Sequence, residues 1–553
     1  MGLIVKPISS LEKCFLDDDI NLKTEYKKAS CLKDELFRFG ICYCMDERCH
    51  TGIPIILGVE SDIKEHLTVK RVEHVPVKLA AHGWNEDPNY LRKKAGLYPD
   101  PLIPLNSYNR IQASQNLESL YVEVDTKDIE KSGIHKIEFT FTNAYDNKII
   151  AKTEFELEII DCSLPEQELI YTQWFYCDCL MDYYRTEAFD EKHWEIIEKF
   201  LKTAVKNGIN MILTPIFTPP LDTFVGGERT TTQLVDINII NGEYNFDFSK
   251  LERWIDLCIK TGVKYFEMAH LFTQWGAEHA PKIVANINGE ERKIFGWETD
   301  ACGQEYIGFL KTFIPKLLEF LENKGIADRC MFHLSDEPEL EQLPSYKAVR
   351  DAVAPLLEGY PIMDALSNYE FYSEGAVGCP VPSTGSIEKF IENNVPDLWT
   401  YYCGAGGDKI SNRFPSMPSY RNRILGIQLY KYNIKGFLHW GYNYFNDRFS
   451  YSLINPFIVT DGDYFAPAGD AFSVYPALDG SALESLRILV FHDCLQDISA
   501  LKLCEKLYGR DYVMNLIEGE TKPITFKEYP QSAEYLLELR EKINQSIKSK
   551  IEV

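Results

Sequence analysis

Two acidic side chains stand next to each other at Asp336 and Glu337, within the run Met331–Leu340. A short apolar stretch precedes them and Pro338 follows, so we expect a strand to end here. Adjacent carboxylates repel, so at least one should bind a proton more readily than a free carboxylate does. Hydrolysis of a glycosidic bond requires such an acid, still protonated near neutral pH. The same residues are also typical of a helix start, where Asp caps and Glu favours the helix dipole.

The composition is that of a large globular protein with an acidic surface. The chain has 553 residues, which predicts two to four domains, and a net charge of -25. That charge disfavours nucleic acid and anionic membranes as partners, because both carry negative charge themselves. Aromatic residues make up 13% of the chain, and part of that excess can line a sugar site. A neutral oligosaccharide or glycoconjugate substrate is compatible with all of this.

The N-terminal residues show no basic region followed by a long apolar stretch, so we expect no signal peptide. Uncharged stretches do not reach about 18 residues, so no membrane span is expected. The 15 cysteines are scattered and odd in number. This pattern is typical of reduced thiols, and we expect a cytoplasmic protein without a cofactor.

Residues 1–163 are predicted to form an antiparallel β-sandwich domain, because apolar and polar residues alternate with period two. The proline-rich segment 96–105 is interpreted as a loop across the sandwich. The predicted strands lie at 53–60, 67–77, 120–124, 133–142 and 149–160.

Residues 164–504 change to short apolar runs that alternate with amphipathic helical stretches, which predicts a (β/α)8 TIM-type barrel. A doubly wound open sheet is the alternative, but no glycine-rich phosphate loop supports it. The eight expected strands are Leu169–Phe175, Met211–Ile216, Lys264–Ala269, Met331–Leu334, Pro361–Asp364, Leu398–Tyr402, Gly436–Trp440 and Phe472–Tyr475. The expected helices between many of them are 191–207, 248–261, 304–324, 341–357 and 482–503.

Residues 505–553 are predicted to be a C-terminal helical extension with one long charged helix at 532–550. It is interpreted as a packing or oligomer element. The oligomeric state stays open, with a homodimer as one option.

The site of a barrel is built at the carboxyl ends of its strands. These ends are rich in polar and aromatic residues, which a strand core does not need. The catalytic candidates are Glu337 and Asp336. The substrate-binding candidates are Trp174, Asp178, His270, Trp275, Asn368, Tyr369, Tyr402, His439, Trp440 and Asn443. The tryptophans and histidines among them can equally be ordinary core residues.

Metal and serine-hydrolase chemistry have little local support. His270 and His279 with Glu267 offer metal-ligand types, but their nine-residue gap is not a recognised ligand spacing. We therefore expect no metal. No Gly-x-Ser-x-Gly elbow is present in the sequence.

Four motifs resemble glycoside hydrolase family 123 and the wider group that shares its catalytic domain. They are Gln173–Asp178, Thr214–Pro220, His333–Pro338 and Gly436–Asn443. The resemblance covers roughly residues 165 to 510. It implies a retaining β-N-acetylgalactosaminidase that uses substrate assistance. Glu337 would be the general acid/base, and Asp336 would hold the 2-acetamido group while its carbonyl oxygen attacks the anomeric carbon and forms an oxazoline.

The adjacency of the two acids agrees with that mechanism. The carboxylates of an ordinary retaining pair flank the sugar at about 5 Å, which sequence neighbours cannot easily do. If the sugar lacks an acetamide, another residue must be the nucleophile, and Asp364, Glu267 and Asp178 are the candidates. Two alternatives therefore remain: a glycosidase of the same fold that uses double displacement on another sugar, and a non-catalytic carbohydrate-binding barrel.

Overall fold

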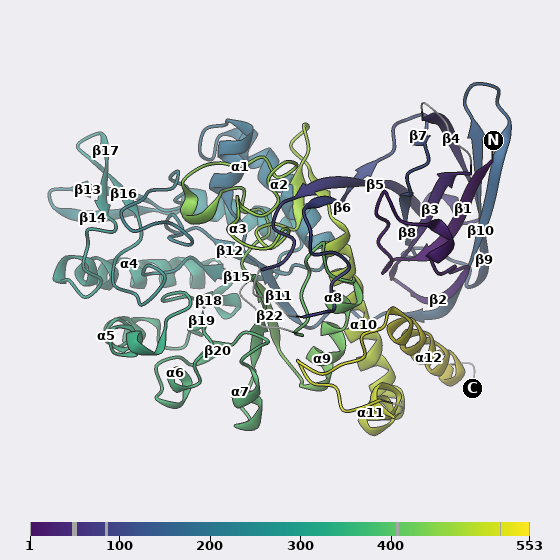
Figure 1. Cartoon of the computed structure of the whole chain (residues 1–553). Coiled ribbons are helices and arrows are strands. Elements are labelled where there is room, and N and C mark those ends of the chain that lie inside the picture. Colours follow the sequence, from purple (N-terminus) through teal and green to yellow (C-terminus); the bar gives the residue numbers. More distant parts are fainter. Residues whose placement is uncertain (1, 47–51, 83–86, 405–408, 520, 552–553) are drawn as a thin grey trace. The chain divides into compact units, whose positions relative to one another are not determined.

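The computed structural model describes residues 2–46, 52–82, 87–404, 409–519 and 521–551. The chain divides into two compact units, drawn together in Figure 1. Unit 1 contains residues 1–168, 408–432 and 483–553, and unit 2 contains residues 169–407 and 433–482. The division predicted from the sequence, at 163 and 504, stays a prediction about folding domains.

Unit 1 contains two five-stranded sheets, which confirms the N-terminal antiparallel sheets. The first has the order β1-β3-β8-β5-β6 and the second β2-β10-β9-β4-β7. All pairs are antiparallel except β10 with β2, which is parallel. The strands are β1 (Leu3–Ser9), β2 (Lys28–Lys33), β3 (Leu36–Met45), β4 (Ile53–Glu60), β5 (Leu67–Val77), β6 (Gly96–Pro104), β7 (Arg110–Ala113), β8 (Glu118–Asp125), β9 (Gly133–Asn143) and β10 (Ile149–Ser163).

The two sheets share one apolar core. Along β10, Phe155, Leu157 and Ile159 are buried while the residues between them face outward, as period-two alternation predicts. The Phe155 ring stacks on Phe39 of β3 at 4.0 Å between centroids, so rings from the two sheets meet directly.

The expected loop at 96–105 is wrong, because this segment forms β6. Its prolines are tolerated since β6 is an edge strand. The N–H that proline lacks is not needed on the side of an edge strand that has no partner.

The C-terminal part of unit 1 is helical. Its helices are α8 (Tyr420–Arg423), α9 (Leu425–Lys431), α10 (Leu486–Tyr508), α11 (Arg510–Glu518) and α12 (Ala533–Ile551). α10 buries residues on all its faces, as a helix surrounded by others does. Ser485 caps it, with its Oγ accepting from Ile488 N at 3.3 Å. α12 confirms the helix predicted at 532–550.

Unit 2 is organised around a six-stranded parallel sheet of order β18-β15-β12-β11-β22-β21. Its strands are β11 (Ile170–Gln173), β12 (Met211–Thr214), β15 (Tyr265–Met268), β18 (Cys330–Phe332), β21 (Trp399–Tyr401) and β22 (Gly436–His439). A parallel pair, β19 (Met363–Ala365) and β20 (Cys379–Val381), forms a second sheet. The chain therefore has a mixed α/β fold.

Seven of the eight expected strands of the barrel are present, and the last one is wrong. The segment Phe472–Tyr475 overlaps β23 (Val474–Pro476), which belongs to a separate two-stranded sheet. The sequence analysis also missed β20, whose three residues are too short to show periodicity. A further four-stranded sheet combines β13 (Asp236–Ile240), β14 (Glu243–Asp247), β16 (Ile283–Ile287) and β17 (Glu290–Phe295).

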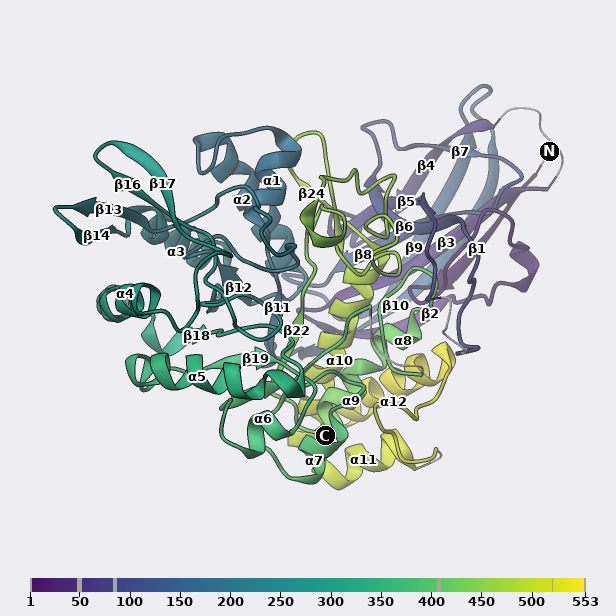
Figure 2. The same cartoon turned by 60° about the vertical axis from the view of Figure 1, so that its left-hand side comes forward.

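The helices of unit 2 are α1 (Cys177–Tyr184), α2 (Glu191–Lys206), α3 (Ser249–Thr261), α4 (Gln304–Asn323), α5 (Leu343–Val353), α6 (Glu370–Ser373) and α7 (Glu388–Glu392). Four of them, α2 to α5, follow predicted amphipathic stretches, whereas α1, α6 and α7 were not predicted. Asp190 caps α2 by accepting from His193 N at 2.6 Å. In Figures 1 and 2, α4 and α5 lie outside the strands of the parallel sheet.

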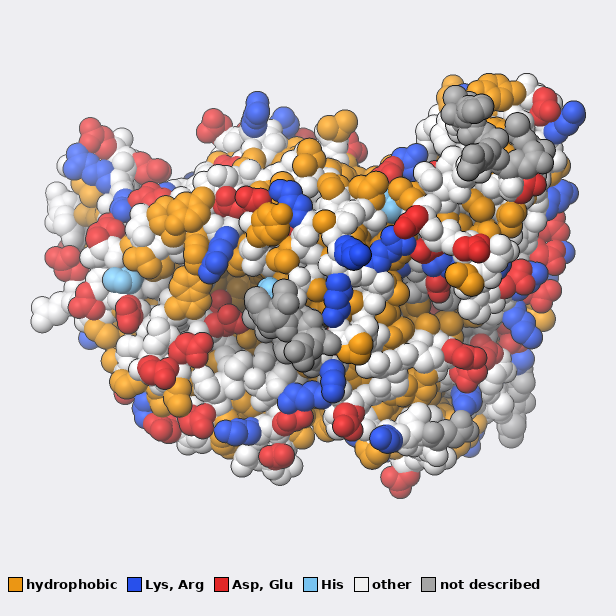
Figure 3. Space-filling model, viewed as in Figure 1, with side chains coloured by type: hydrophobic (Ala, Val, Ile, Leu, Met, Phe, Trp, Pro, Cys, Tyr) orange, Lys and Arg blue, Asp and Glu red, His pale blue; other side chains and the backbone are white. Residues whose placement is uncertain are grey.

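Acidic and basic side chains are mixed over the face that Figure 3 draws, with hydrophobic side chains between them. Among the residues that the structure describes, no helix is both long and apolar enough to cross a bilayer.

Candidate functional site

Asp336 and Glu337 lie four and five residues after the end of β18, and a loop on one side and β19 on the other hold their backbone. The Trp275 N–H donates to the Asp336 carbonyl at 2.9 Å, and the Glu337 N–H donates to the Ala365 carbonyl at 3.0 Å. Glu337 has a φ of 43°, a left-handed conformation that is rare for a residue with a side chain. The helix-start interpretation is wrong, because the first helical turn begins at Leu340 and its N-cap is Glu339 rather than Asp336. The strain instead points to a required side-chain direction.

Both carboxyl groups are half-buried, and both have raised pKa values. Burial raises the pKa of Asp336 well above its usual range, and the neighbouring Glu337 charge adds to this. Burial also raises the pKa of Glu337, although the Tyr401 hydroxyl, which donates to its Oε1 at 2.5 Å, stabilises the ionised form. The pair therefore retains a proton at a pH where free carboxyl groups have lost theirs.

A buried network of charged groups lies just before the pair in the chain, with His333 at its centre. Nε2 of His333 is 2.5 Å from Oε1 of Glu267, and Nδ1 is 3.1 Å from Oδ1 of Asp364. All three side chains are inaccessible to solvent. Burial opposes a charge on His333, but the two carboxylates outweigh it and raise its pKa to about 10. His333 is therefore an imidazolium that neutralises buried negative charge.

The two carboxylates of this network are also saturated by uncharged donors. Glu267 accepts from the indole N–H of Trp174 at 2.7 Å and from the Thr172 hydroxyl at 2.8 Å. Asp364 accepts from the Tyr346 hydroxyl and from Leu334 N at 3.0 Å. Trp174, a predicted sugar contact, is thus buried and uses its only polar group inside the protein.

His270 is buried beside the network, and neither of its ring nitrogens has a hydrogen-bond partner among the residues that the structure describes. Its ring stacks on His333 at 4.3 Å. Burial, together with the nearby His333 charge, lowers the pKa of His270 well below its usual range. His270, His333 and Asp364 have ligand-type atoms within 4.8 Å of one another. The donor set does not fit a metal, because both His333 nitrogens already bind carboxylates.

Two predicted residues contact Asp470, which was not predicted from the sequence, and a third packs against one of them. Trp440 donates its indole N–H to Oδ2 of Asp470 at 3.0 Å, and Nε2 of His439 lies 3.4 Å from Oδ1. The Tyr402 ring packs edge-on against His439 at 5.3 Å. The charge of Asp470 contributes to the raised pKa of Glu337, so this group lies close to the acid pair.

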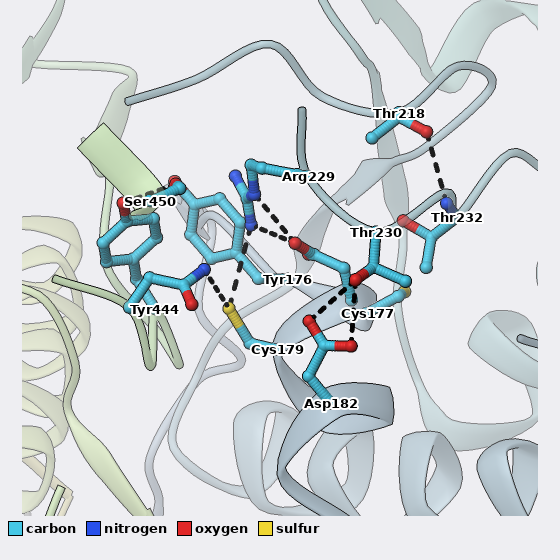
Figure 4. A network of polar contacts seen from close by, with 12 residues as sticks. Tyr176, Cys177, Cys179, Asp182, Thr218, Arg229, Thr230, Thr232, Tyr444 and Ser450 are labelled. Atoms are coloured by element: carbon cyan, nitrogen blue, oxygen red, sulfur yellow. Dashed lines mark hydrogen bonds and ion pairs between the residues drawn. The ribbon is translucent and has the colours of Figure 1, made fainter. Parts of the chain in front are cut away.

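Asp178 and Asn443, which follow β11 and β22, bind other groups of the protein. Asp178 forms a buried ion pair with Arg229 at 2.6 Å, and Figure 4 shows the guanidinium beside Tyr176 and Cys179. The side-chain amide of Asn443 accepts from the Tyr176 N–H and donates to its carbonyl, both at 2.9 Å. These contacts give both residues a structural role.

The other predicted residues lie on loops that follow the strands. Asn368 and Tyr369 come shortly after Ala365, whose carbonyl receives the Glu337 N–H, and both are half-buried. Trp275 follows β15, and 38% of its side chain is exposed.

Tyr401, the partner of Glu337, was not predicted from the sequence, although its neighbour Tyr402 was. Successive strand residues face opposite sides, so one of the two had to point away from Glu337. Sequence alone does not say which. Asp222 was missed as well, although its charge helps to raise the pKa of Asp336.

Comparisons with known proteins are consistent with this geometry. The family model described as the catalytic domain of glycoside hydrolase 123 matches residues 174–504. A family 123 glycoside hydrolase from Clostridium perfringens, whose structural analysis addresses glycolipid glycan hydrolysis, has a similar fold. Its TM-score is 0.74 at 16% sequence identity, over 100% of this chain and 98% of that chain.

A β-glucuronidase from Ruminococcus gnavus, in complex with uronic isofagomine, matches over 83% of this chain and 66% of that chain. Its TM-score of 0.30, at 10% identity, is too low to carry an argument. A search of curated proteins finds no match.

Proposed function

Because the chain belongs to glycoside hydrolase family 123, we propose that this glycosidase cleaves β-linked N-acetylgalactosamine with retention and substrate assistance. The main observation in support is that two adjacent, half-buried carboxyl groups with raised pKa values lie on the loop after β18. Neighbours in sequence reach the leaving oxygen and the 2-acetamido group from one side of the sugar.

The first chemical step follows from the positions of these groups. Glu337 donates its proton to the glycosidic oxygen while the acetamide carbonyl oxygen attacks the anomeric carbon. The bond to the leaving group breaks, and an oxazolinium forms on the sugar. Asp336 accepts a hydrogen bond from the acetamide N–H and stabilises the positive charge that develops there.

The second step reverses the role of Glu337. Its carboxylate removes a proton from a water molecule, which attacks the anomeric carbon from the face that the leaving group left. The oxazoline ring opens, and the product keeps the β configuration. Tyr401 stabilises the ionised Glu337 between the steps, because its hydroxyl donates to Oε1.

The alternative nucleophiles support the same proposal. Double displacement requires a free carboxylate on the far side of the sugar, and Glu267, Asp364 and Asp178 were the candidates. All three are buried and bound to His333 or Arg229. A substrate that supplies its own nucleophile makes none of them necessary.

We also propose that eight parallel strands form a closed ring equivalent to a (β/α)8 barrel. The ring would follow the chain order β11, β12, β15, β18, β19, β20, β21 and β22. Parallel bridges between Phe332 and Ile362 and between Ser383 and Tyr401 support it, because they lie between the six-stranded sheet and the β19–β20 pair. An experimental structure with a gap at either bridge would contradict the ring.

The proposed activity is tested by Glu337→Gln on an aryl β-N-acetylgalactosaminide. We expect kcat to fall by about 10²–10⁴-fold with an unchanged thermal unfolding curve. Glu341→Gln, an exposed acid four residues further on, serves as the matched control and should retain wild-type turnover. Unchanged turnover in Glu337→Gln would reject the assignment.

Substrate assistance is tested with a thiazoline analogue of the oxazoline, which should inhibit competitively. In Glu337→Ala, azide should restore turnover of a substrate with an activated leaving group and give the β-glycosyl azide. Turnover without inhibition by the thiazoline would indicate double displacement on another sugar. Sugar binding without turnover on any aryl glycoside would indicate a binding protein.

A further inference from the structure

A row of contacting aromatic side chains, two of them exposed and two half-buried, lies on loops near the acid pair, and we call it the aromatic platform. It consists of Trp275, Phe449, Tyr451 and Phe224. Ring centroids are 5.7 Å apart for Trp275 and Phe449, 6.4 Å for Phe449 and Tyr451, and 4.4 Å for the stacked Tyr451 and Phe224. Trp275 is 38% exposed and Tyr451 is 63% exposed, whereas Phe449 and Phe224 are half-buried. Exposing aromatic rings to water is unfavourable, so a continuous row of them indicates a binding surface.

The platform is assembled from three loops that are distant in sequence, and one buried residue joins them. Asp222, near Phe224, donates its N–H to Gln274 Oε1 at 2.6 Å. Its Oδ2 accepts from the Tyr444 hydroxyl at 2.7 Å and from Phe449 N at 3.3 Å. The Ser450 hydroxyl donates to the Asp222 carbonyl at 2.8 Å, and Figure 4 shows Ser450 beside Tyr444. The loops are thus tied together beneath the rings.

The backbone of these loops is strained at four residues in or next to the platform. Asp222, Trp275, Phe449 and Ser450 have φ values of 43°, 59°, 60° and 59°, all in the left-handed region. Each such residue costs on the order of 1 kcal/mol, and structures retain such strain mainly where function requires it. The bonds to Asp222 keep the strained loops in one arrangement.

The platform is continuous with the acid pair. The backbone N–H of Trp275 donates to the Asp336 carbonyl at 2.9 Å, and the side-chain amide of Gln342 donates to the Trp275 carbonyl at 2.6 Å. The charge of Asp222 is close enough to help raise the pKa of Asp336. The pair is half-buried, whereas Trp275 and Tyr451 reach further into solvent. The platform thus lies between the acid pair and solvent, where the outer part of a substrate could contact it.

We propose that the aromatic platform binds the sugar ring on the leaving-group side of the glycosidic bond. The C–H face of a pyranose packs on an aromatic face, and rigid rings lose little conformational entropy on binding. A carbohydrate also suits the polar atoms around the rings better than an apolar chain does. This inference rests on the proposed glycosidase activity and adds a second sugar to its substrate.

The test compares two substrates that differ only beyond the scissile bond. One is β-N-acetylgalactosaminyl fluoride, whose leaving group does not reach the platform, and the other is a β-N-acetylgalactosaminyl disaccharide. For Trp275→Ala and Tyr451→Ala, we expect the ratio of kcat/KM for the disaccharide to that for the fluoride to fall about tenfold. The control Tyr145→Ala removes an exposed ring of the β-sandwich (78% exposed) and should leave this ratio at the wild-type value.

Ser450→Ala tests the junction at Asp222 without removing a ring. It should raise KM for the disaccharide about threefold and leave kcat for the disaccharide near its wild-type value, because only the position of the platform changes. A lower kcat together with a higher KM on both substrates would indicate a general structural defect and would contradict the inference.

The two proposals fail in different ways. A wild-type protein that hydrolyses neither substrate contradicts the proposed function and the platform with it. A wild-type protein that hydrolyses both, with an unchanged ratio in both ring variants, contradicts the platform alone.

Discussion

The core of the β-sandwich and the ends of the parallel strands bury their side chains equally well but with opposite chemistry. Between the sandwich sheets, Phe39 and Phe155 stack as hydrocarbon rings without access to solvent. At the strand ends of unit 2, Glu267, His333 and Asp364 are just as inaccessible and carry charge. Apolar burial stabilises a fold directly, whereas a buried ion pair barely repays the cost of desolvation.

This difference indicates that the sandwich core mainly contributes stability, whereas the strand ends of unit 2 carry the functional groups. The sandwich has no reason to bury charge, and its core does not. The strand ends accept buried charges, left-handed residues and two repelling acids, since these fix and protonate the groups that do chemistry. Substitutions in the two regions should therefore change different properties.

The largest effect is expected for Phe39→Ala. Removing a stacked ring from the sandwich core leaves a cavity and should lower the free energy of unfolding of unit 1 by about 3–5 kcal/mol. Activity per folded molecule should stay at the wild-type level. Urea unfolding and active-site titration measure the two quantities, and Leu22→Ala, at an exposed site (83%), is the control.

Asp336→Asn should have the converse effect. Loss of the carboxylate should lower kcat by about 10²–10³-fold, the range found when one stabilising group of a transition state is removed. The free energy of unfolding should not fall, because the substitution relieves the repulsion with Glu337. A clear loss of stability with retained activity would show that Asp336 is structural.

His333→Gln tests whether the charge of buried His333 makes the free energy of unfolding depend on pH. The pKa of His333 is raised to about 10 in the fold, against about 6.5 in an unfolded chain. A raised pKa stabilises the fold fully below the lower value, and this contribution disappears as the pH rises through the higher value. The wild-type free energy of unfolding should therefore fall between about pH 6.5 and pH 10.

The variant provides the control for that slope. It lacks the titrating group, so its stability should be lower at neutral pH and should change less over the same range. Parallel slopes for both proteins, measured by urea unfolding at several pH values, would contradict a charged His333.

Tyr401→Phe should have the smallest effect. The hydroxyl stabilises ionised Glu337 by a hydrogen bond, so its removal raises the pKa of Glu337 further. Turnover requires protonated Glu337 and declines as the pH rises through that pKa. The alkaline limb of kcat/KM should therefore move upward, by about one pH unit for a bond to a charged group. A shift to lower pH would contradict this role.

Much of the fold was predictable because it follows from local patterns. Period-two alternation identified five of the ten sandwich strands (β4, β5, β8, β9 and β10), and amphipathic periodicity identified α2, α3 and α4 nearly to the residue. The errors occurred where pattern gives no information. Segment 96–104 contains three prolines and is a strand only because it lies at a sheet edge. β20 has three residues, so neither its apolar character nor its length distinguishes it from a loop.

The two acids of the site were predictable from the sequence, whereas most of the residues that surround them in space were not. Asp336 and Glu337 are adjacent in sequence, and their mutual repulsion needs no fold to be recognised. Tyr401, Asp470 and Asp222 lie 64, 133 and 115 residues from Glu337 along the chain, and only packing brings them near the acids. Predicted contacts such as Asp178 and Asn443 instead bind protein groups.

The sequence by itself determined that two neighbouring carboxyl groups end a strand of an α/β unit and that an antiparallel β unit precedes it. Both conclusions depend on neighbours in the chain, whose spacing is fixed by covalent geometry. Only the tertiary structure decided the charge of His333, the burial of the alternative nucleophiles and the tie between Asp222 and the aromatic platform. Charge and burial depend on the surroundings of a group in space, and those surroundings come from residues far apart in sequence.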